Sequence, residues 1–118
     1  MKTESAGAIV MLYLVTGEYI ENSVSAEAFP QVWETVIRPS LESLAKMADE
    51  KKITGGILAG QKAAAFVFEA QSNEELDKTI GGLPFWGLVK WGVTPLTSVR
   101  SAIERDRRAV EGMKAAKR

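Results

Sequence analysis

The chain of 118 residues contains no histidine and no cysteine. The lack of cysteine excludes disulfides, thiolate nucleophiles and thiolate metal ligands. The lack of histidine removes the commonest metal ligand, the commonest general base at neutral pH and the axial ligand of most haem sites. We therefore expect no metal and no cofactor. Any acid–base chemistry falls to Asp, Glu, Lys or Tyr.

The chain also lacks an excess of charge of either sign, with 15 basic and 15 acidic side chains. No overall field attracts it to nucleic acid or to anionic lipid, so we expect neither as a partner. The basic segment 98–118 has an apolar stripe and interleaved acidic residues, which favours a docking helix with a solvated outer face. The glycine-rich stretch 55–60 lacks the Lys-Ser/Thr of a phosphate-binding loop and favours a strand with a close backbone approach.

Long hydrophobic runs are missing too. The longest, residues 6–15, follows Lys2 but is too short to span a bilayer, and no small-x-small cleavage site comes after it. We interpret it as a buried strand and expect a cytoplasmic protein. The length fits a single domain over residues 1–118.

Hydrophobic periodicity and turn residues predict the elements. We expect strands at 9–15, 53–60, 63–70 and 89–94, a long helix at 25–51, a second helix after Ser72 and a terminal helix at 98–118. Ser72 and Glu75 have the spacing of a capping box, and Gly81-Gly82 ends that helix. Pro39 should kink the long helix or split it near Arg38. Pro95 should end the last strand.

This order of elements predicts an α+β fold, a ferredoxin-like βαββαβ arrangement with an extra C-terminal helix. Such a sheet has helices on one face only, yet two strands are apolar on both faces. Their side chains alternate as Ile9, Met11, Tyr13, Val15 against Val10, Leu12, Leu14, and as Ala64, Phe66, Phe68 against Ala63, Ala65, Val67. An exposed apolar sheet would aggregate, so we expect a homodimer or a higher homo-oligomer.

The segment 72–96, SNEELDKTIGGLPFWGLVKWGVTPL, resembles the C-terminal half of the muconolactone delta-isomerase family. The similarity covers residues 65–96, and its firmest points are Ser72-Asn73, Glu75-Leu76, Gly82-Leu83-Pro84 and Val93-Thr94-Pro95-Leu96. The resemblance implies a dimeric α/β barrel, and a cofactor-free proton transfer on a lactone. The hairpin 53–70 and the last strand, with Lys90 and Gly92, depart from the family, so its proton-transfer residues have no counterpart here. The catalytic residues are therefore unknown.

A ligand pocket can still be predicted from aromatic and ionisable residues near the last strand. Phe85, Trp86 and Trp91 are either a pocket wall or core packing. Strand-borne Tyr13, Glu69 and Lys90 are either functional or solvated at strand ends. The predicted pocket comprises Tyr13, Phe66, Trp86, Trp91, Lys90 and Glu69. Trp91 and Lys90 are neighbours on one strand and face opposite ways, so we favour Trp91 with Tyr13 over Lys90.

Three functions remain open from the sequence. The first is a cofactor-free enzyme, isomerase-like or oxygenase-like, for a small lactone or aromatic-derived acid. The second is a non-catalytic protein that binds a small apolar molecule. The third is a structural oligomer with a fully packed interior.

Overall fold

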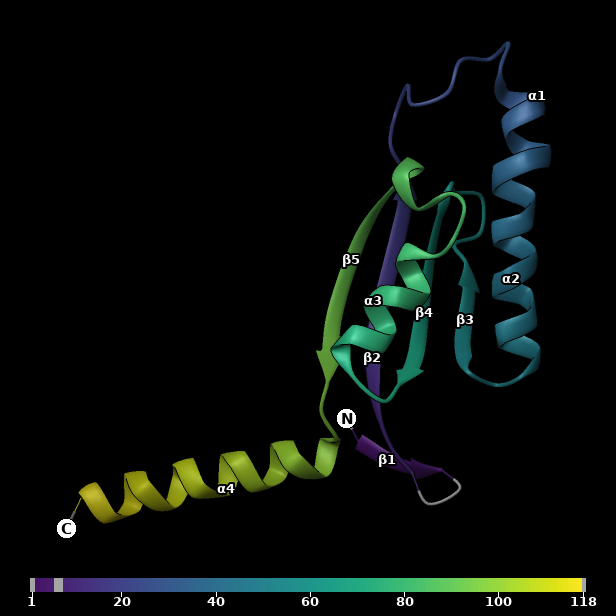
Figure 1. Ribbon diagram of the computed structural model, residues 1–118. Coiled ribbons are helices and arrows are strands. Elements are labelled where there is room, and N and C mark those ends of the chain that lie inside the picture. The colour runs from purple at the N-terminus through teal and green to yellow at the C-terminus, as the bar shows by residue number, and fades with distance from the viewer. Residues whose placement is uncertain (1, 6–7, 118) are drawn as a thin grey trace.

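The computed structural model describes residues 2–5 and 8–117, with side chains described from residue 10 onward. Ala6 and Gly7 of the apolar run, the side chain of Ile9, and Arg118 of the terminal helix lie outside the described residues. The strands are β1 (Lys2–Ser5), β2 (Ala8–Tyr19), β3 (Ile53–Ile57), β4 (Ala63–Ala70) and β5 (Val89–Leu96). The helices are α1 (Phe29–Val32), α2 (Arg38–Asp49), α3 (Asn73–Gly81) and α4 (Val99–Ala116), with a π-helix (Trp33–Ile37) and a 3-10 turn (Trp86–Leu88) (Figure 1).

One antiparallel sheet holds all five strands. Its four long strands lie in the order β5-β2-β4-β3, with β2 in the centre. The predicted α+β class is confirmed, and this strand order is compatible with the ferredoxin-like arrangement. The remaining strand, β1, pairs with the start of β2 and was not predicted, because its sequence KTES is too polar to give a strand signal.

Several strands end at residues other than those predicted, because strand pairing sets their ends. β2 continues to Tyr19 because β4 and β5 both pair with it as far as Glu18. β3 ends at Ile57, since residues 58–62 form the turn into β4. The prediction that Pro95 ends the last strand is wrong. Pro95 lies opposite Tyr13 in β5, where an edge strand tolerates a missing N–H donor.

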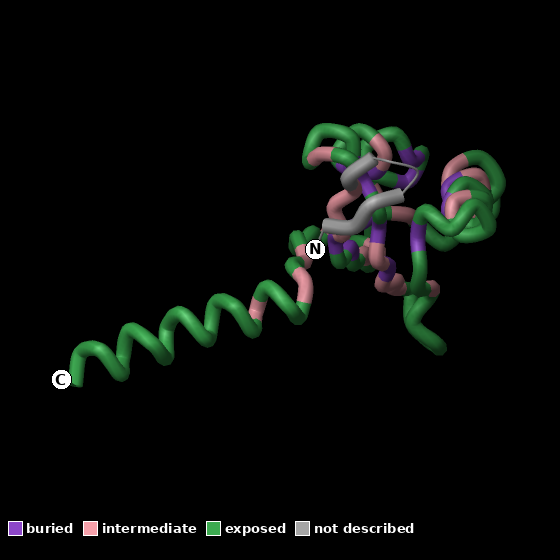
Figure 2. Tube along the Cα trace, turned by 90° about the horizontal axis from the view of Figure 1, so that it is seen from below, coloured by how far each residue is buried: buried purple, intermediate pink, exposed green. Residues whose placement is uncertain are grey.

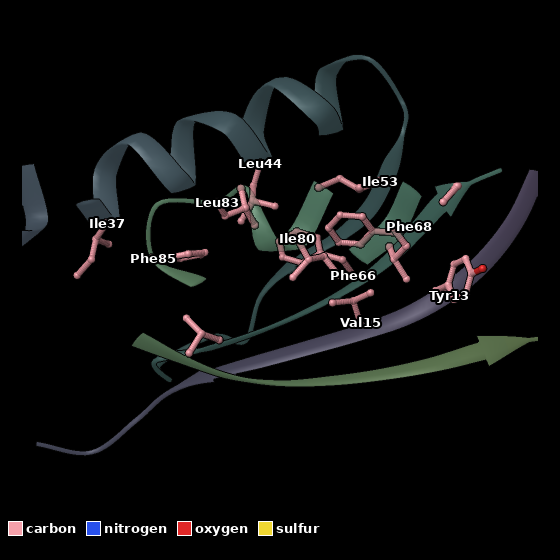
Figure 3. Packing of buried hydrophobic residues seen from close by; sticks show 13 residues of the cluster. Tyr13, Val15, Ile37, Leu44, Ile53, Phe66, Phe68, Ile80, Leu83 and Phe85 are labelled. Carbon is pink, nitrogen blue, oxygen red and sulfur yellow. The ribbon is translucent and has the colours of Figure 1, made fainter. Parts of the chain in front are cut away.

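Both α2 and α3 lie on the same side of the sheet, where α2 contacts β3 and α3 contacts β4 (Figures 1 and 2). The core fills the space between these helices and the sheet, and Figure 3 shows its side chains converging there. Its largest fully buried members are Tyr13, Phe68 and Val15. Alternation along β2 and β4 therefore directs the larger apolar set toward the helices.

The long helix starts later than predicted and is interrupted as predicted. It begins at Phe29, and the Ser25 hydroxyl accepts the Ala28 N–H in a preceding turn instead of capping the helix. Before Pro39 the helix widens into a π-turn, in which the Arg38 N–H donates to the Trp33 carbonyl. This wider turn accommodates a proline ring that would otherwise clash with the preceding turn.

The opposite face of the sheet is not covered by any helix of the described chain (Figures 1 and 2). Cross-strand rows on this face bring Leu14 beside Val67 and Thr94, and Thr16 beside Ala65 and Gly92. Leu14 is 38% exposed. We call this surface, formed by Leu12, Leu14, Thr16, Ala65, Val67, Thr94 and Leu96, the open sheet face. Its small and apolar composition is that of a surface that packs against another sheet.

The terminal helix α4 does not dock as predicted. It leaves the end of β5 after two residues and points away from α2 and α3 (Figures 1 and 2). None of its residues, all of which the structure describes, is buried. It gives the chain a longest extent of 71 Å, against 35 and 25 Å in the other directions. Within the described residues, no helix has both the length and the apolar character needed to cross a membrane.

Candidate ligand-binding site

An aromatic cluster lies between the sheet and the turn before β5. Phe85, in that turn, makes edge-to-face contacts with Tyr19 at 6.1 Å and with Trp91 at 5.9 Å between ring centroids. Tyr19 comes from the end of β2 and Trp91 from β5. The three rings therefore join two strands and a turn, and such contacts add to the stability that burial provides.

Gly17 makes room for the Trp91 ring, which lies across from it in the strand register. A Cβ at Gly17 would lie 2.9 Å from Val89 Cγ1 and 3.3 Å from the indole ring. The Trp91 Nε1 donates a hydrogen bond of 3.1 Å to the Trp86 carbonyl. The hydrogen bond to the turn before β5 thus fixes the position of the indole. Trp91 lines two hollows, one on each side of its ring.

The first hollow, which we call the α2 pocket, has a volume of about 220 Å³. Its walls are mainly apolar and come from α2, β2, β4, β5 and the turn: Leu41, Leu44, Phe66, Phe85, Val89 and Trp91. Glu18, Tyr19, Gln61 and Lys62 also line it. An apolar cavity of about 150 Å³ is known to accept benzene in another protein. The α2 pocket is therefore large enough for a ring compound with one or two substituents.

Tyr19 lines the α2 pocket and has a perturbed pKa. Burial raises the pKa of the Tyr19 hydroxyl above its ordinary value of 10.0, because the phenolate would lose hydration. At neutral pH the hydroxyl is therefore protonated and can donate a hydrogen bond to a ligand oxygen.

The second hollow, which we call the α3 groove, runs between α3 and β5 and has a volume of about 560 Å³. It is lined by Tyr13, Asn73, Glu74, Leu76, Asp77, Ile80, Trp86, Trp91, Val93 and Pro95. The buried Tyr13 donates a hydrogen bond of 2.5 Å from its hydroxyl to Asn73 Oδ1. Trp86 is 54% exposed at the groove. The groove is thus a wide, mainly apolar channel with carboxylates along one side.

The structure brings together only part of the predicted pocket. Tyr13, Trp86 and Trp91 line the α3 groove, whereas Phe66 lines the α2 pocket with Trp91. Lys90 lies next to Glu18 across the strands, on the face opposite Trp91.

Glu69 also lies on the open side of the sheet, where it pairs in register with Leu12. Lys90 and Glu69 therefore line neither the α2 pocket nor the α3 groove, although Lys90 lines a separate hollow with Thr16, Trp91 and Gly92. The cause is the alternation of side chains along β4 and β5.

Sequence reasoning missed Tyr19, Leu41, Leu44 and Lys62. Tyr19 was detectable, because extending the alternation of Tyr13 and Val15 through Gly17 reaches it, whereas the predicted strand stops at residue 15. The two α2 leucines lie on its apolar stripe but gave no sign of a cavity, since a stripe shows only which side of a helix is buried.

Among the described residues, no three acidic side chains gather in a way that would hold a metal ion. Comparison of the chain with models of known protein families and with curated proteins gave no match.

Proposed function

We propose that this chain is the subunit of a homodimeric α/β barrel, similar in plan to muconolactone isomerases, that binds a small apolar ring compound carrying an acidic group. The observation that carries the proposal is the α2 pocket, whose lining is mainly apolar and includes Tyr19 and Lys62. Ligand sites are usually of this kind, with few polar groups that fix orientation.

The dimer is supported by the open sheet face. Leu14 is more than a third exposed in the centre of the sheet and lies in a row with Val67. Two copies that pack these faces together remove the apolar surface from water at about 25 cal/mol per Å². A two-fold axis is the commonest symmetry for such self-complementary contacts.

The class of ligand follows from size and charge. The volume of about 220 Å³ fits a single substituted ring and leaves no room for a nucleotide. The Lys62 ammonium suits a carboxylate, and the Tyr19 hydroxyl suits a carbonyl or a ring oxygen. Small lactones and aromatic acids combine these features.

A panel of small lactones and aromatic acids, screened by thermal shift and then by Trp fluorescence, tests the ligand site. A ligand should raise the melting temperature and quench the emission of Trp91, which lines the pocket. The Leu41→Phe variant should lose binding at least tenfold, because the larger side chain fills the pocket. Met47→Phe is the matched control, since Met47 is also half-buried on α2 but lies away from the pocket.

Equal loss of affinity in both variants, or binding that neither variant changes, would contradict the α2 pocket as the site. If the whole panel fails to bind the wild-type dimer, the structural-oligomer alternative takes the place of the ligand-binding function.

A second candidate, catalysis of a double-bond shift, has support from one observation. Tyr19 and Lys62 both line the α2 pocket, so two groups that can donate a proton lie beside the same space. For an isomerase that turns over a bound lactone, Tyr19→Phe should lower kcat by tenfold or more and leave KM nearly unchanged. A ligand that binds and is recovered unchanged identifies the protein as a binder.

A further inference from the structure

The α4 helix carries an apolar stripe with no partner in the chain. Val99, Ile103, Val110 and Met113 follow the spacing of one helix face, and their exposed fractions are 80%, 58%, 46% and 65%. Asp106 lies on the same face, between Ile103 and Val110. Most helices in proteins owe their stability to the packing of such a face. An 18-residue helix whose stripe lies wholly in water is therefore suited to a surface outside its own chain.

A row of positive charges flanks this stripe. Arg100, Arg107 and Lys114 are spaced by seven residues, which places them on one side of the helix next to the stripe. Arg107 also pairs with Glu104 on its own helix, at 2.7 Å. The helix as a whole carries five basic and three acidic side chains.

The α3 groove has the complementary character. Its apolar lining includes Leu76, Ile80, Trp86, Val93 and Pro95. Its charged lining residues are Glu74 and Asp77, both acidic and both on α3. A helix with a row of cations beside an apolar stripe therefore fits this groove with its basic side toward α3.

The area of the open sheet face points to the same contact. Its three strands, spaced by about 4.8 Å and about 26 Å long, present a face of roughly 370 Å². A stable dimer usually buries about 800 Å² on each partner. An 18-residue helix covers a strip about 27 Å long and about 10 Å wide. Each subunit would bury such a strip twice, once on its own α4 and once on the groove that receives the α4 of the second copy. Together the two contacts reach the usual size.

We propose that α4 is an arm that lies in the α3 groove of a second copy of the chain, and that the groove is complete only in the assembled protein. The inference rests on the proposed homodimer. The linker between β5 and α4 has only two residues, and the helix points away from its own α3 (Figure 1). Exchange of an identical element between subunits requires little new structure, and short hinges favour it.

Cross-linking between subunits tests the arm, and the absence of native cysteine makes it specific. Differently tagged subunits that carry either Val93→Cys in the groove or Met113→Cys on the stripe are co-refolded and treated with a short bis-maleimide. We expect a linked pair containing both tags. Ala115→Cys is the matched control, because it lies two residues further on the opposite side of α4 and should link much less.

The Val93→Cys, Met113→Cys double variant distinguishes the two ways of docking. A link within one chain, with none between tags, would show that α4 folds back on its own groove and would overturn the inference. Light scattering on the same samples separates the proposals. A dimer without stripe-specific links would contradict the proposed arm and support the proposed dimer. A monomer near 12.8 kDa would contradict both proposals.

A second measurement is independent of the link position. Replacing Ile103 and Val110 with Asp should shift Trp emission to the red, since Trp86 then loses its cover in the groove. Arg105 and Arg108, replaced by Ala on the outer side of α4, should leave the emission unchanged. Identical spectra for the wild type and both variants would contradict the docking of α4.

Discussion

At the residue scale, one buried hydroxyl ties the long helix to the turn that precedes β5. Ser40 is fully buried, and its Oγ donates to the Val36 carbonyl and accepts the Phe85 N–H, each at 2.9 Å. The bond holds the turn that carries Phe85 against α2, and so fixes one wall of the α2 pocket.

Replacing Ser40 with Ala should lower the free energy of unfolding by about 1–3 kcal/mol, because the buried Phe85 N–H loses its acceptor. Urea denaturation of both proteins measures the change. Ser43→Ala, an exposed position on the same helix, is the control and should stay within about 0.5 kcal/mol of the wild type. Equal stability of all three proteins would show that the tie is unimportant.

Tyr19 gives the protein a pH dependence in the alkaline range. Its pKa in the folded chain is raised above 10.0 by burial, so the unfolded chain loses this proton first as the pH rises. This contribution to stability is complete below pH 10 and is lost as the pH rises through the folded pKa. The fall in unfolding free energy above pH 10 should be shallower in Tyr19→Phe than in the wild type.

A direct titration checks the same point. The chain has two tyrosines, so Tyr13→Phe leaves Tyr19 alone. Ultraviolet difference absorption should then show one phenol that ionises above pH 10 in the folded protein and near pH 10 in urea. Coincident midpoints would contradict the effect of burial.

At the scale of elements, the start of α3 depends on a capping residue, and α3 provides half of the residues that line the α3 groove. The Ser72 hydroxyl accepts the Glu75 N–H at 3.1 Å, which satisfies one of the free donors at the start of the helix. The next residue, Asn73, then meets Tyr13 of β2. The cap thus fixes the register of α3 against the sheet.

We expect Ser72→Ala to cost about 1 kcal/mol of unfolding free energy, because the cap is lost. Ser72→Thr should recover most of that amount, since threonine caps helices in the same way. Thermal denaturation of the three proteins is sufficient. A Thr variant no better than the Ala variant would point to a role for Ser72 other than capping.

At the scale of the whole molecule, the open sheet face is unprotected apolar surface in the isolated chain. Leu14 and Leu58 have nearly the same exposure, 38% and 39%, but only Leu14 lies on this face. Leu58 lies in the turn between β3 and β4. The two leucines therefore form a matched pair for testing assembly.

Leu14→Asp should convert the dimer into a monomer near 12.8 kDa, because two carboxylates would be buried without partners in the interface. Leu58→Asp should leave the molar mass at the dimer value. Light scattering at micromolar concentration measures both, and circular dichroism verifies folding. A wild type that is itself monomeric would contradict the proposed assembly.

The sequence by itself determined the local structure. β4 and α3 have the bounds that their patterns predicted, because an apolar strand and a capping box are set by neighbouring residues. The break before Pro39 is local for the same reason. The two-sided apolar strands also predicted a sheet face without helical cover.

Only the tertiary structure decided which residues form a site. Tyr19, Leu41 and Phe85 are distant in sequence and meet because β2, α2 and a turn converge. Glu69 was separated from Trp91 by the strand register, which depends on pairing across the sheet. The path of α4 was likewise beyond the sequence. Periodicity shows that a helix has an apolar face, but it does not show which surface covers this face, because packing between distant parts decides that.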